Sequence, residues 1–105
     1  MTILEKLNNL ERYSGEDKFS PEAIADAKRF IETLDINNIW QPYISVIEDG
    51  EVNFWWDCPI WLDLGMYGDG TYSYYACFED KSELFGVCIP VSESLPAKIL
   101  DTLRI

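Results

Sequence analysis

Residues 43–78 read YISVIEDGEVNFWWDCPIWLDLGMYGDGTYSYYACF, and this stretch decides the fold. Its apolar and aromatic runs are interrupted by residue types that favour tight turns, namely Asp49-Gly50, Cys58-Pro59 and Gly68-Asp69-Gly70. Asp-Gly favours the type I′ turn of a hairpin, and proline cannot donate a hydrogen bond within a central strand. The pattern therefore predicts antiparallel strands at residues 43–48, 51–56, 60–66 and 71–78, with a shorter fifth strand at 84–89 on an edge.

A helix is expected before these strands. Ser20-Pro21-Glu22 supplies a hydroxyl N-cap, a proline at the first helical position and an acid in the first turn. An apolar stripe follows at Ala23, Ile24, Ala27, Phe30, Ile31 and Leu34.

Two further helices are expected at the ends of the chain. The first begins at Thr2, ends near Tyr13-Ser14-Gly15 and has its apolar stripe at Ile3, Leu4, Leu7 and Leu10. The last is capped by Ser92 or Ser94, has Pro96 in its first turn, and carries Leu95, Ile99, Leu100 and Leu103 on one face. The sequence thus predicts a single α+β domain over residues 1–105. It has two N-terminal helices, an antiparallel meander of four to five strands and one C-terminal helix, with the helices on one face of the sheet.

The two faces of the predicted sheet differ in composition, because side chains alternate along a strand. The face assigned to the helices carries Val52, Phe54, Trp56, Ile60, Leu62, Leu64, Tyr72, Tyr74, Ala76 and Phe78. The opposite face carries Asn53, Trp55, Asp57, Trp61, Asp63, Tyr67, Ser73, Tyr75 and Cys77, and no predicted helix remains to cover it. Trp40, just before the strands, is expected to fill the seam between helices and sheet, with an exposed position as the alternative.

Aromatic rings beside carboxylates predict a docking surface for arginine or lysine side chains of a partner, since arginine stacks on rings while pairing with aspartate. The candidate partner-binding residues are Trp55, Asp57, Trp61, Asp63, Tyr67, Asp69 and Tyr75. Alternatively, these rings are cross-strand pairs that only stabilise an exposed face. A register shift of one residue would exchange the two faces.

Charge is distributed unevenly along the chain, whose formal net charge is −11. No lysine or arginine occurs from Ile31 to Asp80, where carboxylates stand at Glu32, Asp35, Glu48, Asp49, Glu51, Asp57, Asp63, Asp69, Glu79 and Asp80. Such a charge opposes direct binding to nucleic acid or anionic membranes, which are themselves polyanionic. It favours a cationic protein partner, or simply solubility.

The chain lacks residues that several kinds of catalytic and binding sites usually need. The chain has no histidine, the commonest general base, and no glycine-rich phosphate loop. Its three cysteines, Cys58, Cys77 and Cys88, form no CxxC pair and are expected to be small buried apolar residues. We therefore expect no catalytic residues, no cofactor and no metal site. Neither a signal peptide nor an apolar run of about 20 residues is present, so a cytoplasmic location is expected.

From Ser20 onward the order of helix, turn and strand motifs resembles that of a group of small uncharacterised bacterial and prophage α+β proteins. The matching pieces are Pro21, Ala27, Phe30-Ile31, Pro42, Asp49-Gly50, Trp56, Asp69-Gly70 and Tyr72-Ser73-Tyr74-Tyr75. These are turn and core positions, so the resemblance implies a fold and no catalytic residues. Where such proteins carry a W-D-G-Y-like segment between the first two helices, this chain has Tyr13-Ser14-Gly15-Glu16. In size and charge the chain is also similar in style to phage inhibitors of host defence, including anti-CRISPR proteins.

Three functions fit these features. The first is a non-enzymatic inhibitor of phage or mobile-element origin that blocks a basic, nucleic-acid-binding surface of a larger host protein. The second is an antitoxin or immunity protein that neutralises one cognate toxin. The third is a structural protein in which the exposed face pairs with itself as a homodimer.

Overall fold

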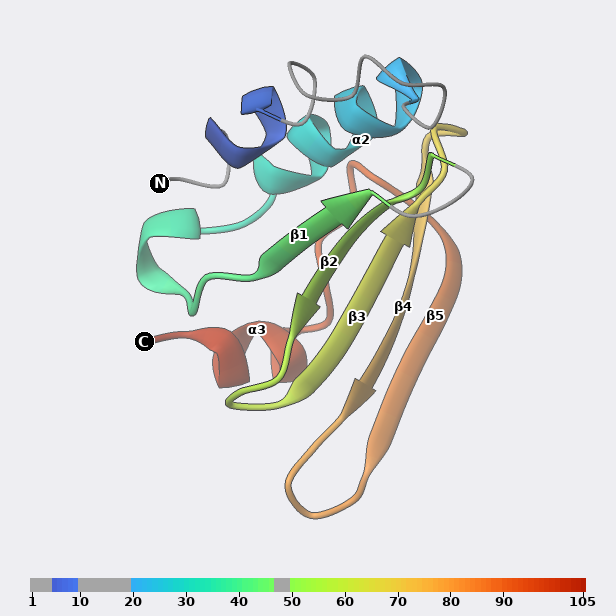
Figure 1. The fold of residues 1–105 in the computed structure, drawn as a ribbon. Helices are drawn as coiled ribbons and strands as arrows, with labels where there is room; N and C mark the ends of the chain where they lie inside the picture. The colour runs from blue at the N-terminus through green and yellow to red at the C-terminus, as the bar shows by residue number, and fades with distance from the viewer. Residues whose placement is uncertain (1–4, 10–19, 47–49) are drawn as a thin grey trace.

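The computed structural model describes residues 5–9, 20–46 and 50–105, and its centre is one five-stranded antiparallel sheet (Figure 1). The strands are adjacent in chain order: β1 (Tyr43–Val46), β2 (Val52–Trp56), β3 (Trp61–Met66), β4 (Thr71–Cys77) and β5 (Glu83–Pro90). The predicted α+β meander, with helices before and after it, is confirmed. Thr2, Ile3, Leu4, Leu10, Tyr13-Ser14-Gly15 and Asp49 lie outside the described residues.

Helical segments flank the sheet. Residues 5–9 are helical, followed by α2 (Pro21–Ile31), the short 3-10 helix η1 (Ile36–Asn38) and α3 (Ala97–Leu103). The predicted N-cap of α2 is confirmed, because Ser20 Oγ accepts a hydrogen bond from the Ala23 backbone N–H at 3.2 Å. None of the helices in the described ranges is long and apolar enough to cross a membrane.

The core lies between the helices and one face of the sheet. All ten side chains predicted for the helix-covered face are buried: Val52, Phe54, Trp56, Ile60, Leu62, Leu64, Tyr72, Tyr74, Ala76 and Phe78. Every residue of the predicted α2 stripe is buried as well, and Leu7 joins the same cluster from the N-terminal helix. The predicted register is therefore correct, since a slip of one residue would have exposed this set.

A buried carboxylate joins α2 to the sheet. Asp26 is almost fully buried on α2 and accepts a hydrogen bond from the Gly70 backbone N–H at 2.8 Å. The β3–β4 turn comes so close to α2 that a Cβ on Gly68, whose φ is 97°, would lie 2.8 Å from Glu22 Cβ. The turn sequence Gly68-Asp69-Gly70 is thus needed both for its conformation and for this contact.

Two expectations about secondary structure were wrong. The fifth strand is the longest, at eight residues, because its pairing with β4 continues through a bulge opposite Tyr72 and Tyr74 as far as Pro90. Neither predicted serine caps α3, which begins after Pro96; the Ser94 hydroxyl instead donates to the Thr33 carbonyl at 3.3 Å.

The cysteines are not buried. Cys58 lies in the turn after β2 and Cys88 at the β5 bulge, where its φ is 55°, and both are exposed. Cys77 is half-buried on the face of β4 that no helix covers. For Cys58 and Cys88, turn and edge positions thus outweigh the general tendency of free cysteine to be buried.

The prediction that Trp40 fills the helix–sheet seam is wrong, because the residue is exposed and only its backbone is bound there. Its N–H donates to the Leu103 carbonyl and its carbonyl accepts from Trp56 Nε1, each at 2.8 Å, while the residue remains 48% exposed. The indole of Trp56, predicted to lie on the helix-covered face, is buried.

Tyr72 gives the fold a sensitivity to alkaline pH. Its ring is buried, its hydroxyl donates to the Glu93 carbonyl at 3.0 Å, and burial raises the pKa of Tyr72 to about 12. Because the folded state favours the protonated phenol, this contribution is complete below about pH 10 and is lost as the pH rises from about 10 to about 12.

We expect urea unfolding to show stability falling over that window. Tyr72→Phe, which cannot ionise, should flatten the fall while losing about 0.5–1.5 kcal/mol at neutral pH with its hydrogen bond. An unchanged alkaline slope in Tyr72→Phe would contradict this assignment.

Candidate functional site

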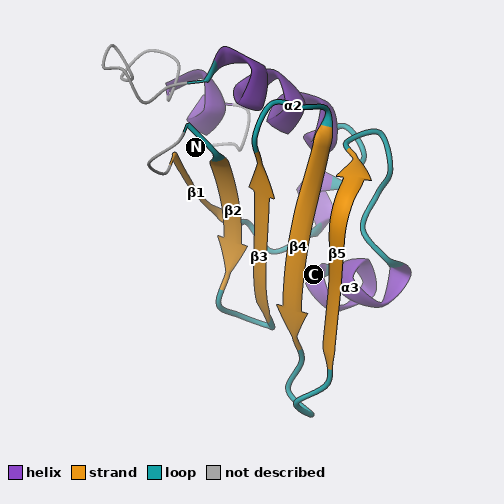
Figure 2. Cartoon of the chain, turned by 90° about the vertical axis from the view of Figure 1, so that its right-hand side faces the viewer, coloured by secondary structure: helices purple, strands orange, loops and turns teal. Residues whose placement is uncertain are grey.

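One face of the sheet is covered by none of the helices in the described ranges, and it carries a row of side chains across all five strands. The register places these residues directly opposite one another, so they share one face: Tyr43, Trp55, Asp63, Tyr75 and Phe85. We call these five residues the outer row. Figure 2 looks onto this side of the sheet, with α2 above the strands and α3 behind them. Tyr43, Tyr75 and Phe85 are exposed, and Phe85 is 72% exposed.

Aromatic rings at one end of the outer row pack against one another. Tyr43 and Trp55 stack with their ring centroids 4.3 Å apart, and Trp61 lies against Trp55 at 6.2 Å. Such pairs stabilise a sheet by about 0.5–1.5 kcal/mol each beyond area burial. Ring contacts considered from the sequence are therefore present at Trp55 and Trp61, yet Trp61 still leaves 46% of its surface exposed.

Asp63 lies at the centre of the row and is held in place by Asn53. The Asn53 Nδ2 donates both to Asp63 Oδ1 and to the Leu64 carbonyl, the latter at 2.9 Å. Within the described ranges Asp63 Oδ2 accepts no hydrogen bond. One carboxylate oxygen is thus oriented by the sheet and the other is available to an incoming donor.

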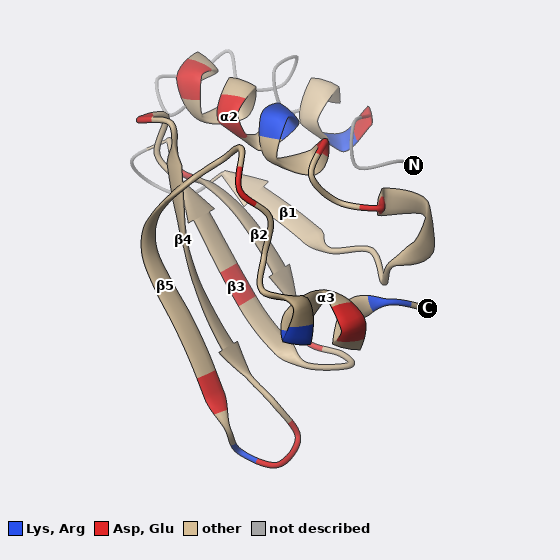
Figure 3. Ribbon diagram, turned by 180° about the vertical axis from the view of Figure 1, so that it is seen from behind, with Lys and Arg blue, Asp and Glu red and all other residues tan. Residues whose placement is uncertain are grey.

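The strands contain no positive charge. No lysine or arginine occurs in β1 to β5, and Figure 3 shows the cationic residues of the described ranges on helices, in the β4–β5 loop and near the C-terminus. Asp63 and Glu83 are the carboxylates within the strands. The Glu83 carboxylate interacts with the Tyr75 hydroxyl and raises the pKa of Tyr75.

The structure brings most, but not all, of the predicted residues together. Trp55, Asp63 and Tyr75 belong to the outer row, and Trp61 contacts it through Trp55. Asp57 is exposed just beyond the end of β2.

Asp69 lies elsewhere, in the β3–β4 turn beside α2. Its carboxylate accepts from the Thr71 N–H at 3.0 Å and from the Thr71 hydroxyl at 2.7 Å, and both bonds lower the pKa of Asp69. Its role there is to stabilise the turn, so we do not include it in the candidate surface.

Next to the outer row is a cavity of about 430 Å³, which we call the acidic hollow. Its lining includes two carboxylates and two exposed tyrosine rings, and consists of Glu51, Asp63, Gly65, Tyr67, Ser73, Tyr74, Tyr75, Gly86 and Val87. Of the predicted residues, Tyr67 belongs here together with Asp63 and Tyr75.

Sequence reasoning missed Glu51, Tyr43, Phe85 and Val87. Glu51 is only 8% exposed although it precedes β2 on the uncovered face, and its carboxylate occupies the space that a Cβ on Gly65 would fill. Glu51 could have been assigned to the uncovered face from the sequence, because it stands two residues before Asn53 and alternate residues of a strand share a face. Tyr43 and Phe85 could have been found in the same way once β1 and β5 were paired.

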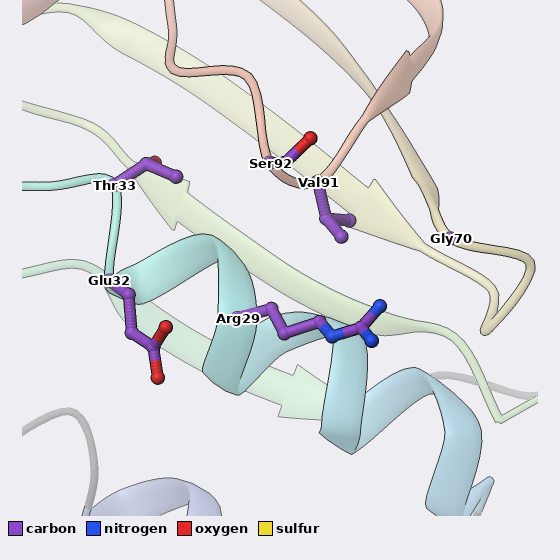
Figure 4. A pocket seen from close by; sticks show the side chains of 6 residues that line it. All are labelled: Arg29, Glu32, Thr33, Gly70, Val91 and Ser92. Atoms are coloured by element: carbon purple, nitrogen blue, oxygen red, sulfur yellow. The ribbon is translucent and has the colours of Figure 1, made fainter.

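A second cavity, of about 490 Å³, lies between α2 and the segment that follows β5 (Figure 4). Its lining residues are Arg29, Glu32, Thr33, Gly70, Val91 and Ser92. The Gly70 N–H and the Thr33 hydroxyl already donate within the protein, to Asp26 and to the Phe30 carbonyl. Arg29 and Glu32 bring opposite charges, so this cavity has no strong preference for one sign of ligand charge.

In the described part of the chain no group of Cys, Asp and Glu side chains is arranged to hold a metal ion. Comparisons with protein-family models, with curated proteins and with solved structures found no match to this chain. The outer row and the acidic hollow combine exposed rings with carboxylates, which suits them to bind a cationic partner.

Proposed function

We propose that this protein is a non-enzymatic binding protein whose outer row and acidic hollow dock onto a basic surface of a larger protein. One observation carries the proposal: an uncovered sheet face combines exposed aromatic rings with carboxylates, and the strands that form it contain no lysine or arginine. Aromatic residues dominate binding hot spots, and arginine is their frequent partner.

The net charge of −11 adds a long-range electrostatic attraction to a basic partner. A surface of one sign attracts an oppositely charged partner before contact and raises the association rate. Basic protein surfaces of this kind commonly bind nucleic acid, so a protein that covers one would act as an inhibitor of that binding. This is the mode of action expected of a phage or mobile-element inhibitor, of which anti-CRISPR proteins are examples.

Self-association is the second candidate, because β5 is an edge strand with exposed Phe85 and Val87. An exposed apolar edge invites pairing with another strand. Two features of the same strand oppose it: the bulge at Cys88 and Pro90 at its end, both of which interrupt edge pairing. Two copies would also repel one another through their negative charge.

We expect association with the partner to be sensitive to ionic strength. Raising salt from about 0.05 M to about 0.5 M should lower the association rate at least about tenfold while the dissociation rate changes little, because screening acts mainly on encounter. Stopped-flow or surface plasmon resonance measurements would show this. An association rate that is independent of salt would contradict electrostatic docking.

Identifying the partner requires the wild-type protein and a matched pair of variants as baits. Wild-type protein, Trp55→Ala and Trp40→Ala would be used to capture proteins from lysate at low salt. We expect a basic protein that is captured by wild type and Trp40→Ala, is lost with Trp55→Ala, and is released by competing nucleic acid. Equal capture by all three baits, or no effect of nucleic acid, would overturn the proposal. Light scattering that shows a stable dimer would favour self-association instead.

A further inference from the structure

We infer that the acidic hollow receives a single arginine side chain of the partner. This inference rests on the proposed function and specifies the contact at its centre. The hollow adjoins Asp63 and Tyr75 of the outer row, so an arginine held there would fix the position of the partner along the whole face.

The carboxylates of Asp63 and Glu51 supply the negative charge of the hollow. Asp63 is oriented through Oδ1 by Asn53, and Glu51 lies across Gly65 in the adjacent strand with 8% of its surface exposed. A guanidinium group presents five donors in a planar fork and can bond more than one acceptor at once. Lysine concentrates its charge in a compact, strongly hydrated ammonium group, which loses more hydration on direct contact with the carboxylates.

The walls of the hollow suit the rest of an arginine side chain. Tyr67 is 60% exposed and Tyr75 is also exposed, and both line the cavity, so a planar cation can stack on a ring there. Val87 adds an exposed apolar wall against which the methylene stem can pack.

Gly65 is the reason that the floor of the hollow can hold a carboxylate. A side chain at this position would occupy the place of Glu51 Oε1, so only glycine lets the carboxylate lie flat against the sheet. The volume of about 430 Å³ falls in the range of sites that bind small groups, about 300–1,000 Å³. It suits one inserted side chain and not an entire helix.

The cavity lining includes no lysine or arginine from the described part of the chain. This distinguishes the acidic hollow from the cavity beside α2, which already contains Arg29.

The test uses three synthetic peptides that are identical and neutral except for one central arginine, lysine or citrulline. Binding to the full chain would be followed by NMR of backbone amides and by tryptophan fluorescence. We expect the arginine peptide to bind about fivefold or more tightly than the lysine peptide, and to shift the amides of residues 63, 65 and 75. Citrulline, which keeps the shape but has no charge, should not saturate.

Two variants locate the contact. Asp63→Asn should weaken arginine-peptide binding about tenfold, the loss typical of one charge-assisted hydrogen bond. Asp101→Asn is the control, because it makes the same change of net charge at an exposed residue of α3. Val87→Arg places a guanidinium of the chain itself at the exposed wall and should block the peptide, even if Asp63→Asn fails to fold.

Equal affinity for the arginine and lysine peptides, or equal binding by Asp63→Asn and Asp101→Asn, would overturn the arginine assignment. The proposed function would survive that result if the captured basic partner still bound with the expected salt dependence. If both measurements failed, the arginine assignment and the docking proposal would fall together.

Discussion

Replacing Trp56 by alanine is expected to lower the free energy of unfolding by about 3–5 kcal/mol, as is typical of large aromatic side chains removed from a core. Trp56 is 1% exposed, lies opposite Leu62 on the helix-covered face, and belongs to the cluster that contacts the helices. Its Nε1–H also holds the Trp40 carbonyl at 2.8 Å, so the substitution removes both a large buried volume and the hydrogen bond that fixes the chain before β1.

Trp40→Ala is the matched control for this substitution. The same residue type is removed, but Trp40 is 48% exposed and it accepts the hydrogen bond through its backbone, which alanine retains. We expect a loss of at most about 1 kcal/mol, as for most surface positions. Urea unfolding followed by circular dichroism would measure both. Similar losses for the two variants would show that the ring of Trp40, and not its backbone, stabilises the seam.

The sheet could be predicted from the sequence because its pattern has a single solution. Val52, Phe54 and Trp56 alternate with Asn53 and Trp55, and any other register would expose the apolar set. Ser20 could be recognised as an N-cap because that signal is local.

The predictions for Trp40, the fifth strand and the cap of the last helix were wrong because contacts with distant segments of the chain decide these features. Whether the ring or the backbone of Trp40 enters the seam depends on Trp56 and Leu103, which are far away in the sequence. The length of β5 depends on how far β4 can pair with it, and the Ser94 hydroxyl is used by Thr33 and not by α3.

The candidate surface was predictable in composition but not in arrangement. Alternation alone assigned Trp55, Asp63 and Tyr75 to one face, but only the register shows that they lie in a single row with Tyr43 and Phe85. Asp69 was included because it follows the same stretch of sequence, yet the turn directs it toward Thr71 beside α2. Glu51 was missed because a glutamate next to a turn is usually solvated.

Trp61→Ala is expected to weaken binding to the captured basic partner by about 30-fold or more, which corresponds to the loss of about 2 kcal/mol that defines a hot spot. Trp61 is 46% exposed beside Trp55, so docking can bury the rest of its ring against an arginine or an apolar side chain. Trp40→Ala should change the affinity less than about twofold, since Trp40 lies before β1 with its backbone bound to α3 and Trp56.

The comparison is informative because Trp61 and Trp40 have nearly the same exposure, 46% and 48%, but only Trp61 lies beside the outer row. A general loss of stability or of apolar surface would affect both variants alike, whereas docking through the outer row affects only Trp61. Isothermal titration calorimetry at fixed salt would give both affinities, with folding checked by circular dichroism. Equal weakening by the two substitutions, or none by Trp61→Ala, would mean that the partner binds elsewhere and that the exposed rings serve only to stabilise the sheet.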